Sequence, residues 1–134
     1  MMTGIGSSIV TALLLSASGQ NERVLHTQVG DATFYAKHFE GSTTASGRPF
    51  ESRKAVAAHR TYPFGTVVLV TNRRNGKSVR VVIIDRGPYG RNRREGAIID
   101  VSPAAAARLG MLRDGQVPVT LQVLAWGKPK TTTR

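Results

Sequence analysis

Short hydrophobic runs separated by polar turns occupy much of the chain and predict strands rather than long helices. Residues 67–71 form a continuous β-branched and apolar run, which is typical of a buried strand. Asn75-Gly76, a pair that favours tight hairpin turns, follows it, and residues 79–84 are the expected return strand. Residues 117–123 alternate apolar with mostly polar positions, which predicts a half-buried final strand.

One short helix is predicted among these strands. Residues 33–36 and 97–101 are expected to be further short strands. Ser102-Pro103 then combines a favoured N-cap with a residue favoured at the first helical position, and Gly110 ends the helix after residues 104–109. Many short strands with one brief helix indicate a small β-barrel.

The two ends of the chain differ in composition from its middle. Residues 1–19 carry no charged side chain and hold an apolar run that ends in small residues, as in an export signal peptide; a frayed N-terminus is the alternative. The run is too short to span a bilayer as an ordinary helix. We expect residues 20–30 to be a polar linker, residues 31–126 to form the folded domain and residues 127–134 to be a frayed basic tail.

Composition narrows the possible chemistry. The 134 residues suffice for one domain with a hydrophobic core, and the absence of cysteine excludes a disulfide, a thiolate metal site, a cysteine nucleophile and an acylated lipoprotein. No metal-binding cluster is visible, so we expect neither a metal nor a cofactor. The net charge of +11 attracts polyanions, among them nucleic acids, lipid phosphates and cell-wall polymers. No nucleic-acid-binding motif accompanies the charge, so we expect no nucleic-acid partner.

Four segments carry the most specific pattern in the sequence. In chain order they are TTASG at residues 43–47, AAHRTYPFGT at residues 57–66, a stretch at residues 79–88 that ends in DRGP, and IDVS at residues 99–102. Taken together, roughly residues 30–124 resemble the rare lipoprotein A family of septal lytic transglycosylases. The resemblance implies a mainly β fold, a six-stranded double-psi β-barrel with one or two short helices.

The resemblance also implies an activity. A lytic transglycosylase cleaves peptidoglycan glycan strands by letting the sugar's own 6-hydroxyl attack, which leaves a 1,6-anhydro-muramic end, so one well-placed acid can suffice. The alternative is a non-catalytic, expansin-like module that binds the wall. On either reading we expect peptidoglycan as the partner, a periplasmic or secreted location, a monomer, and no stable membrane anchor.

Four side chains are candidates for catalysis. Asp85 directly follows a buried strand and Asp100 ends the next one, so both are expected at a barrel rim, with Asp85 as the proton donor. Each also has a structural alternative, a turn cap for Asp85 and a helix N-terminus for Asp100. His59 is expected to hold one of the carboxylates by a charge-assisted hydrogen bond, although a buried structural histidine is the alternative. Glu51 completes the set and, taken alone, would be a solvated surface charge.

Two positions near the candidate site, one of them Glu51, depart from the family pattern. Arg48 stands where the family usually has glutamate, and Glu51 stands where it usually has aspartate. We expect Arg48 to lower the pKa of Glu51 and make it a poorer acid, which leaves binding without cleavage open. The candidate substrate-binding residues are Tyr35, Thr44, Arg48, Arg86 and Tyr89.

Sugar stacking and a basic loop complete the expected site. Tyr35 and Tyr89 are the aromatic side chains expected to stack on sugar rings. Residues 91–94 are expected to form a basic loop, which is either solvated or part of the binding surface.

The N-terminal pattern predicts a cleavage event. If residues 1–19 are an export signal, the mature chain starts near Gln20. N-terminal sequencing of the protein recovered outside the cytoplasm should then begin close to that residue. Recovery of the whole population in the cytoplasm with Met1 intact would contradict the prediction.

Overall fold

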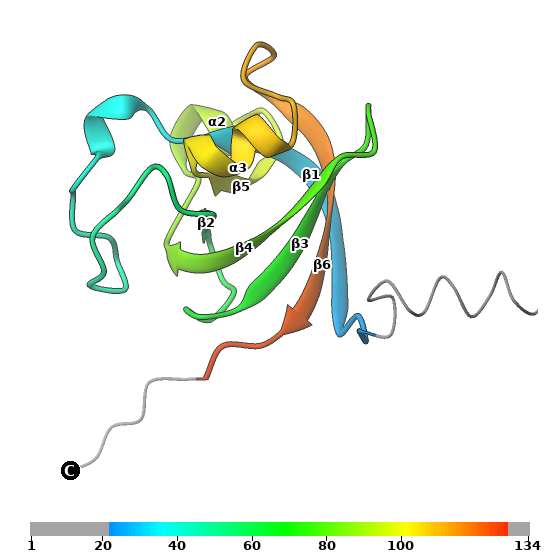
Figure 1. Cartoon of the computed structure of the whole chain (residues 1–134), viewed down its shortest axis with the longest axis horizontal. Helices are drawn as coiled ribbons and strands as arrows, with labels where there is room; N and C mark the ends of the chain where they lie inside the picture. Colours follow the sequence, from blue (N-terminus) through cyan, green and yellow to red (C-terminus); the bar gives the residue numbers. More distant parts are fainter. Residues whose placement is uncertain (1–21, 129–134) are drawn as a thin grey trace, which may run out of the picture.

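Six strands close into a barrel, as expected from the sequence (Figure 1). The computed structural model describes residues 22–128. Around the barrel the strands follow the order β1-β5-β2-β4-β3-β6; β1·β5 and β2·β4 are parallel pairs, and the other four pairs are antiparallel. The strands are β1 (His26–Phe34), β2 (Val56–His59), β3 (Val67–Asn72), β4 (Ser78–Asp85), β5 (Ala97–Val101) and β6 (Val117–Ala125).

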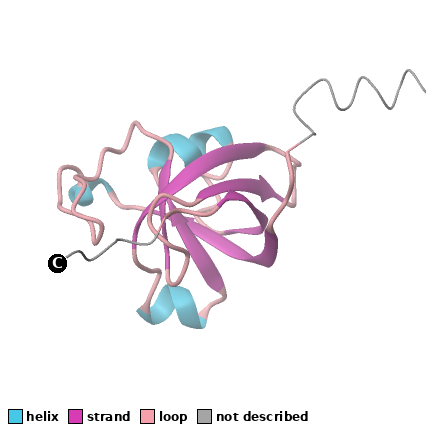
Figure 2. Ribbon diagram, turned by 90° about the horizontal axis from the view of Figure 1, so that it is seen from below, coloured by secondary structure: helices cyan, strands magenta, loops and turns pink. Residues whose placement is uncertain are grey.

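The helices are short and lie outside the strands (Figure 2). Helix α3 (Pro103–Arg108) matches the prediction: Ser102 caps it by accepting a hydrogen bond from the Ala105 amide, and Gly110 follows with φ of 68°. A 3-10 turn, η2 (Lys37–Phe39), follows β1. The expected basic loop is instead helix α2 (Gly90–Arg94), in which Arg91 bonds Glu95 one turn on at 3.1 Å.

The folded domain was expected to begin at residue 31, after a linker. This boundary is wrong, because residues 26–30 belong to β1. They pair with β6 in an antiparallel ladder that begins with His26 opposite Val123. Main-chain hydrogen bonds to β6 stabilise this half of the strand. Its side chains are mostly polar and exposed, so the sequence there shows no hydrophobic pattern that would predict a strand. Close packing requires glycine at position 30 of this strand, since a Cβ there would lie 2.7 Å from the Ile98 side chain. At its other end β1 stops at Phe34, before the expected residue 36.

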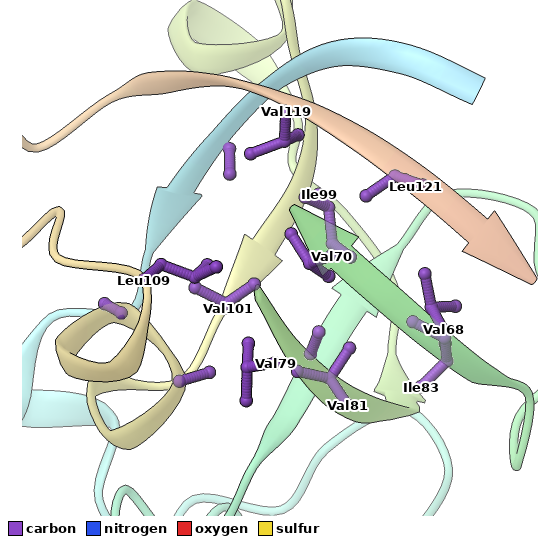
Figure 3. Packing of buried hydrophobic residues seen from close by; sticks show 14 of the residues in the cluster. Val68, Val70, Val79, Val81, Ile83, Ile99, Val101, Leu109, Val119 and Leu121 are labelled. Carbon is purple, nitrogen blue, oxygen red and sulfur yellow. The ribbon is translucent and has the colours of Figure 1, made fainter. Parts of the chain in front are cut away.

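Alternating side chains of the strands fill the barrel (Figure 3). Strand β2, which the hydrophobic pattern did not reveal, is buried at all four positions. A second, smaller cluster lies between the barrel wall and the segment that links η2 to β2; it consists of Tyr35, Phe50, Val56, Ala58 and Ile84. This outer cluster fixes the linking segment against β2 and β4.

The predictions for the two ends lie almost wholly outside the described residues. The signal-like segment falls there entirely, and of the predicted tail only Gly127 and Lys128 are described. No helix between residues 22 and 128 is long and apolar enough to cross a membrane.

The Ser102 hydroxyl joins α3 to strand β2 and generates a stability prediction. This oxygen accepts from the amides of Ala105 and Val56 at 3.3 Å each and donates to the Lys54 carbonyl at 2.5 Å, with the residue wholly buried. Ser102→Ala should therefore lower the free energy of unfolding by about 1–3 kcal/mol, measured by urea denaturation. The exposed Ser78 provides the control, since Ser78→Ala should change it by less than about 0.5 kcal/mol. Equal decreases in the free energy of unfolding of both variants would show that the buried hydroxyl stabilises the fold no more than an exposed one.

Candidate active site and groove

Strand register brings Asp85 and Asp100 to either side of one residue. Ala58 of β2 lies opposite Asp85 of β4 and, on its other side, opposite Asp100 of β5. Thr33 of β1 lies opposite Asp100, so the row continues onto a fourth strand. Ala58 packs in the outer cluster, so this row faces outward from the barrel. The sequence prediction that the two carboxylates lie near each other at strand ends is thus consistent with the fold.

The Asp85 carboxylate is held by three hydrogen-bond donors. Its Oδ1 accepts from the backbone amides of Ala45 at 2.8 Å and Arg86 at 2.9 Å, while its Oδ2 accepts from the Tyr35 hydroxyl at 2.6 Å. Donors of this kind stabilise a charged carboxylate. Asp85 therefore does more than cap its own turn, because it ties β4 to Tyr35, the residue that follows β1, and to the segment before β2.

Asp100 occupies a different environment. Burial, reinforced by the nearby negative charge of Asp85, raises the pKa of Asp100 to about 6, against the opposing effect of a 3.2 Å hydrogen bond from the Thr33 hydroxyl. Asp100 thus keeps its proton to a higher pH than an ordinary aspartate.

Tyr35 contacts Asp85 rather than offering a free ring for sugar stacking. Its side chain is 7% exposed, and its ring is stacked on Phe50 with centroids 4.2 Å apart. Burial and the hydrogen bond to Asp85 raise the pKa of the phenol, so it remains a donor. The expectation of sugar stacking is therefore better met by Tyr89, which is 57% exposed at the start of α2.

The expectation that His59 holds a carboxylate is wrong. Because side chains alternate along β2, His59 points away from the face that carries Ala58. Its Nε2 lies 2.9 Å from Gln28 Oε1, and its ring stacks on Tyr62 at 3.5 Å. Burial and neighbouring positive charges lower the pKa of His59 to about 4, so the ring is neutral, and its Nδ1 accepts the amides of Thr61 and Tyr62.

Glu51 also has other partners than expected. Its Oε1 lies 2.6 Å from Lys54 Nζ, and this contact lowers the pKa of Glu51. The direction of the predicted shift is right, but its cause is Lys54 and not Arg48. Glu51 contributes nothing to the lining of the groove that contains Arg48.

That groove adjoins Asp85 and has a volume of about 670 Å³. The two residues whose amides bind Asp85, Ala45 and Arg86, both line it. Thr44 is buried, and its hydroxyl donates to the Arg48 carbonyl at 2.6 Å, so it shapes the groove wall from behind. The lining residues are Ala45, Ser46, Arg48, Thr61, Pro63, Phe64, Gly65, Arg86 and Lys128.

Two groups that contact the aspartates of the site were not predicted from the sequence. Thr33 lies two residues before Tyr35, so both fall on one face of the strand predicted at residues 33–36, and this period-2 spacing was a signal that could have found Thr33. The Ala45 amide gives no sequence signal, because its role depends only on backbone position. Within residues 22–128, no three His, Asp or Glu side chains gather closely enough to hold a metal ion.

Comparison with known proteins places this geometry in a family. Residues 27–121 match the family described as lytic transglycolase. The chain is 47% identical over 98 residues to the probable endolytic peptidoglycan transglycosylase RlpA of Aquifex aeolicus, a match covering 73% of this chain and 42% of that protein. It is 40% identical over 109 residues to the endolytic peptidoglycan transglycosylase RlpA of Neisseria meningitidis, with 81% and 44% covered. The chain thus spans less than half the length of these curated relatives.

Solved structures agree with the barrel. A Streptomyces papain inhibitor superposes with a TM-score of 0.58 at 26% identity, covering 75% of this chain and 96% of that one. The expansin of Clavibacter michiganensis gives 0.56 at 25% identity, with 81% and 54% covered. The match to the family extends over most of the described residues and includes both aspartates. On this basis the chain belongs to the rare lipoprotein A (RlpA) family of lytic transglycolases.

Proposed function

We propose that this chain is an endolytic peptidoglycan transglycosylase that acts outside the cytoplasm. The observation that carries the proposal is the pairing of two carboxyl groups in contrasting environments across Ala58, next to an open groove. Relatives at 40–47% identity bear that activity in their names. A glycosidic bond requires an acid for the leaving oxygen and a counter-charge for the sugar cation, and this pair can supply both.

The contrasting environments divide the roles between the two aspartates. Asp100, whose pKa is about 6, is the proton donor to the leaving oxygen. Asp85, surrounded by three donors, is the anion that stabilises positive charge at the sugar's C1. This reverses the sequence expectation that Asp85 is the acid, because burial falls on Asp100 and hydrogen-bond donors fall on Asp85.

The proposed reaction needs no water. The bond from C1 to the bridging oxygen breaks as the Asp100 proton moves to that oxygen. The muramic 6-hydroxyl oxygen then bonds to C1, and the Asp100 carboxylate takes its proton, which returns the side chain to its starting state. The products are a strand with a free 4-hydroxyl and a strand with a 1,6-anhydro end.

The other residues shape the site without proton transfer. Tyr35 orients Asp85, and His59 organises residues 61–62 at the groove wall through its Nδ1. Arg48, Arg86 and Tyr89 remain proposed substrate-binding residues, while Thr44 supports the groove wall through its bond to the Arg48 carbonyl. Glu51, paired with Lys54, is left without a catalytic role.

An expansin-like binding function is the second candidate. The observation in its favour is that Arg48 lines the groove where the family usually has glutamate, while Glu51 is engaged by Lys54. Wild-type protein that binds sacculi but releases no anhydro-muropeptides would establish this alternative.

Substitution of each aspartate tests the division of roles. Asp100→Asn should lower release of anhydro-muropeptides from purified sacculi by about 10²–10⁴-fold, because general acid catalysis is lost. In the wild type, kcat/KM should fall as pH rises above about 6, when Asp100 loses its proton. Asp85→Asn should also lower activity, and its remaining activity should fall off at a lower pH, because removal of a like charge lowers the pKa of Asp100.

Mass spectrometry of the soluble products and a pH series provide the readouts. Asp114→Asn, on an exposed loop before β6, is the matched control and should retain wild-type rates and profile. Full activity in Asp100→Asn would exclude it as the acid. An unshifted profile in Asp85→Asn would show that the two carboxyl groups do not interact.

Asp100 also predicts a pH dependence of stability. Its pKa in the folded protein is about 6, above the ordinary 3.8, so between these values the folded state binds more protons than the unfolded state. Its contribution is therefore complete below about pH 4 and is lost as pH rises through 6. Two pKa units correspond to about 3 kcal/mol, an upper limit here.

Thermal melts of Asp100→Asn should reveal this contribution. The variant's melting temperature relative to wild type should be higher at pH 7.5 than at pH 4.5, since asparagine does not ionise. A difference that is the same at both pH values would contradict the raised pKa.

A further inference from the structure

An exposed pair of aromatic rings lies just beyond the end of β6. Trp126, the only tryptophan in the chain, directly follows this strand and is 44% exposed. His26 on the neighbouring strand β1 is also exposed, and its ring centroid lies 5.9 Å from that of the indole. The two side chains form an aromatic patch on the surface. Because an indole carries a large apolar area, its exposure gives up stabilisation that burial in the barrel would supply.

Buried rings behind the aromatic patch fix the orientation of the indole. Tyr62 is 5% exposed and meets Trp126 edge to face, with centroids 5.5 Å apart and ring planes at 83°. The His59 ring in turn stacks on Tyr62 at 3.5 Å, and the Tyr62 hydroxyl donates to Gln28 Oε1 at 3.1 Å. Since these groups are held inside the barrel, the indole has little rotational freedom left to lose when it binds a ligand.

Strand register places the aromatic patch at the same end of the barrel as the aspartates. Val67 of β3 lies opposite Val82 of β4 and, on its other side, opposite Ala125 of β6. From this row β4 and β6 run in the same direction, because each is antiparallel to β3. One strand therefore leads to Asp85 and the other to Trp126, and two strand spacings, about 10 Å, separate them.

The segment after Trp126 joins the aromatic patch to the groove. The Gly127 amide donates to Thr66 Oγ1 at 2.9 Å, and a Cβ on Gly127 would lie 2.0 Å from the Phe64 carbonyl oxygen. This segment therefore packs directly on the groove wall. Phe64 and Lys128 both line the groove, so its lining continues into the residues next to the indole.

The order of the strands shows where a ligand that fills the groove would lead. Strand β5, which carries Asp100, lies on one side of β4, and strands β3 and β6 lie on the other. The groove is on the β3 and β6 side of Asp85, since residues 63–65 lead into β3 and Lys128 follows β6. A chain that passes Asp100, then Asp85 and then the groove therefore continues toward the aromatic patch.

We propose that Trp126 and His26 form a distal subsite that stacks on a sugar ring of the bound glycan strand beyond the groove. The inference rests on the proposed function, since it assumes that the glycan lies at the two aspartates. The faces of pyranose rings carry C–H groups that stack on an indole, and this contact does not require charge. The subsite is filled only when the strand extends past the groove, so it favours long strands.

Continuity with the groove identifies the glycan as the occupant of the aromatic patch. A second copy of the chain fits less well, because a stable dimer buries roughly 800 Å² on each partner and two half-exposed rings supply far less. A single sugar ring, in contrast, matches the size of one indole face.

The single tryptophan makes the test direct, because all indole emission comes from Trp126. Peptide-free glycan strands, released from sacculi by an amidase and fractionated by length, are titrated into protein carrying Asp100→Asn, so that the strands stay intact. Long strands should quench the indole emission or move it to shorter wavelength, since stacking removes water from the ring. A disaccharide, which fills only the positions at the aspartates, should leave the emission unchanged.

Substitutions in the same background measure the contribution of the ring by calorimetry. Trp126→Ala should weaken the binding of long strands about three- to tenfold and leave that of the disaccharide unchanged, which a misfolded protein would not do. Trp126→Tyr should retain most of the affinity because it keeps an aromatic face. Leu112→Ala is the matched control: this residue is 52% exposed on the loop before β6, at the other end of that strand, and its loss should have no effect.

The outcomes separate the subsite from other occupants and from the proposed function. Unchanged emission with long strands, or equal affinity of the parent and Trp126→Ala, would overturn the subsite. A dimer that Trp126→Ala converts to monomers in sedimentation velocity would also overturn it, since the patch would then join two copies. Wild-type protein that cleaves nothing, together with a loss of affinity in Trp126→Ala, would support the subsite and contradict only the transglycosylase. Cleavage by the wild type with no effect of Trp126→Ala on binding would contradict only the subsite.

Discussion

The register of strand β2 between β4 and β5 is the constraint on which the site depends. Along the parallel pair, Ala57 lies opposite Ile83, but the next residue, Ala58, lies opposite Asp85, so the ladder skips Ile84. Side chains alternate along a strand, and a register shift is a way to turn one residue onto the other face. Here it allows Ile84 to pack in the outer cluster while Asp85, its neighbour, reaches Tyr35 on the same side. Without that shift, Asp85 would not face the same side as Asp100.

Packing in the outer cluster brings the segment before β2 next to Asp85, which completes the site. Phe50 is buried against Tyr35, and this contact draws the segment before β2 onto the barrel wall. The Ala45 amide thereby reaches Asp85, and Arg48 reaches the groove. A small apolar contact thus positions a hydrogen-bond donor and a cation that have no contact with the barrel core.

Neighbouring groups of like type acquire different chemistry from their surroundings. Asp85 and Asp100 are the same residue type on adjacent sides of Ala58, yet donors surround one and burial surrounds the other. Surroundings also set the role of His59, because burial keeps its ring neutral and its Nδ1 accepts hydrogen bonds from the loop that follows β2. Catalytic potential in this barrel therefore follows from solvation and hydrogen bonding more than from residue identity.

The sequence alone determined the family through the order of its motifs, and the resemblance implied the six-stranded barrel. Apolar runs and turn signals, which are local features, located helix α3 and placed Asp85 and Asp100 near each other at strand ends. It did not reveal that residues 26–30 form a strand, since their hydrogen bonds run to β6, about ninety residues away in the chain. It also misplaced His59 and Glu51. Only the tertiary structure decided that His59 faces Gln28, that Glu51 pairs with Lys54, and that Arg48, Arg86 and Lys128 share a groove. The physical reason is that three features set which side chains meet: the alternation of side chains along strands, a one-residue register shift and the long-range closure of the barrel. All three depend on pairing between distant segments, so the local sequence gives no signal for them.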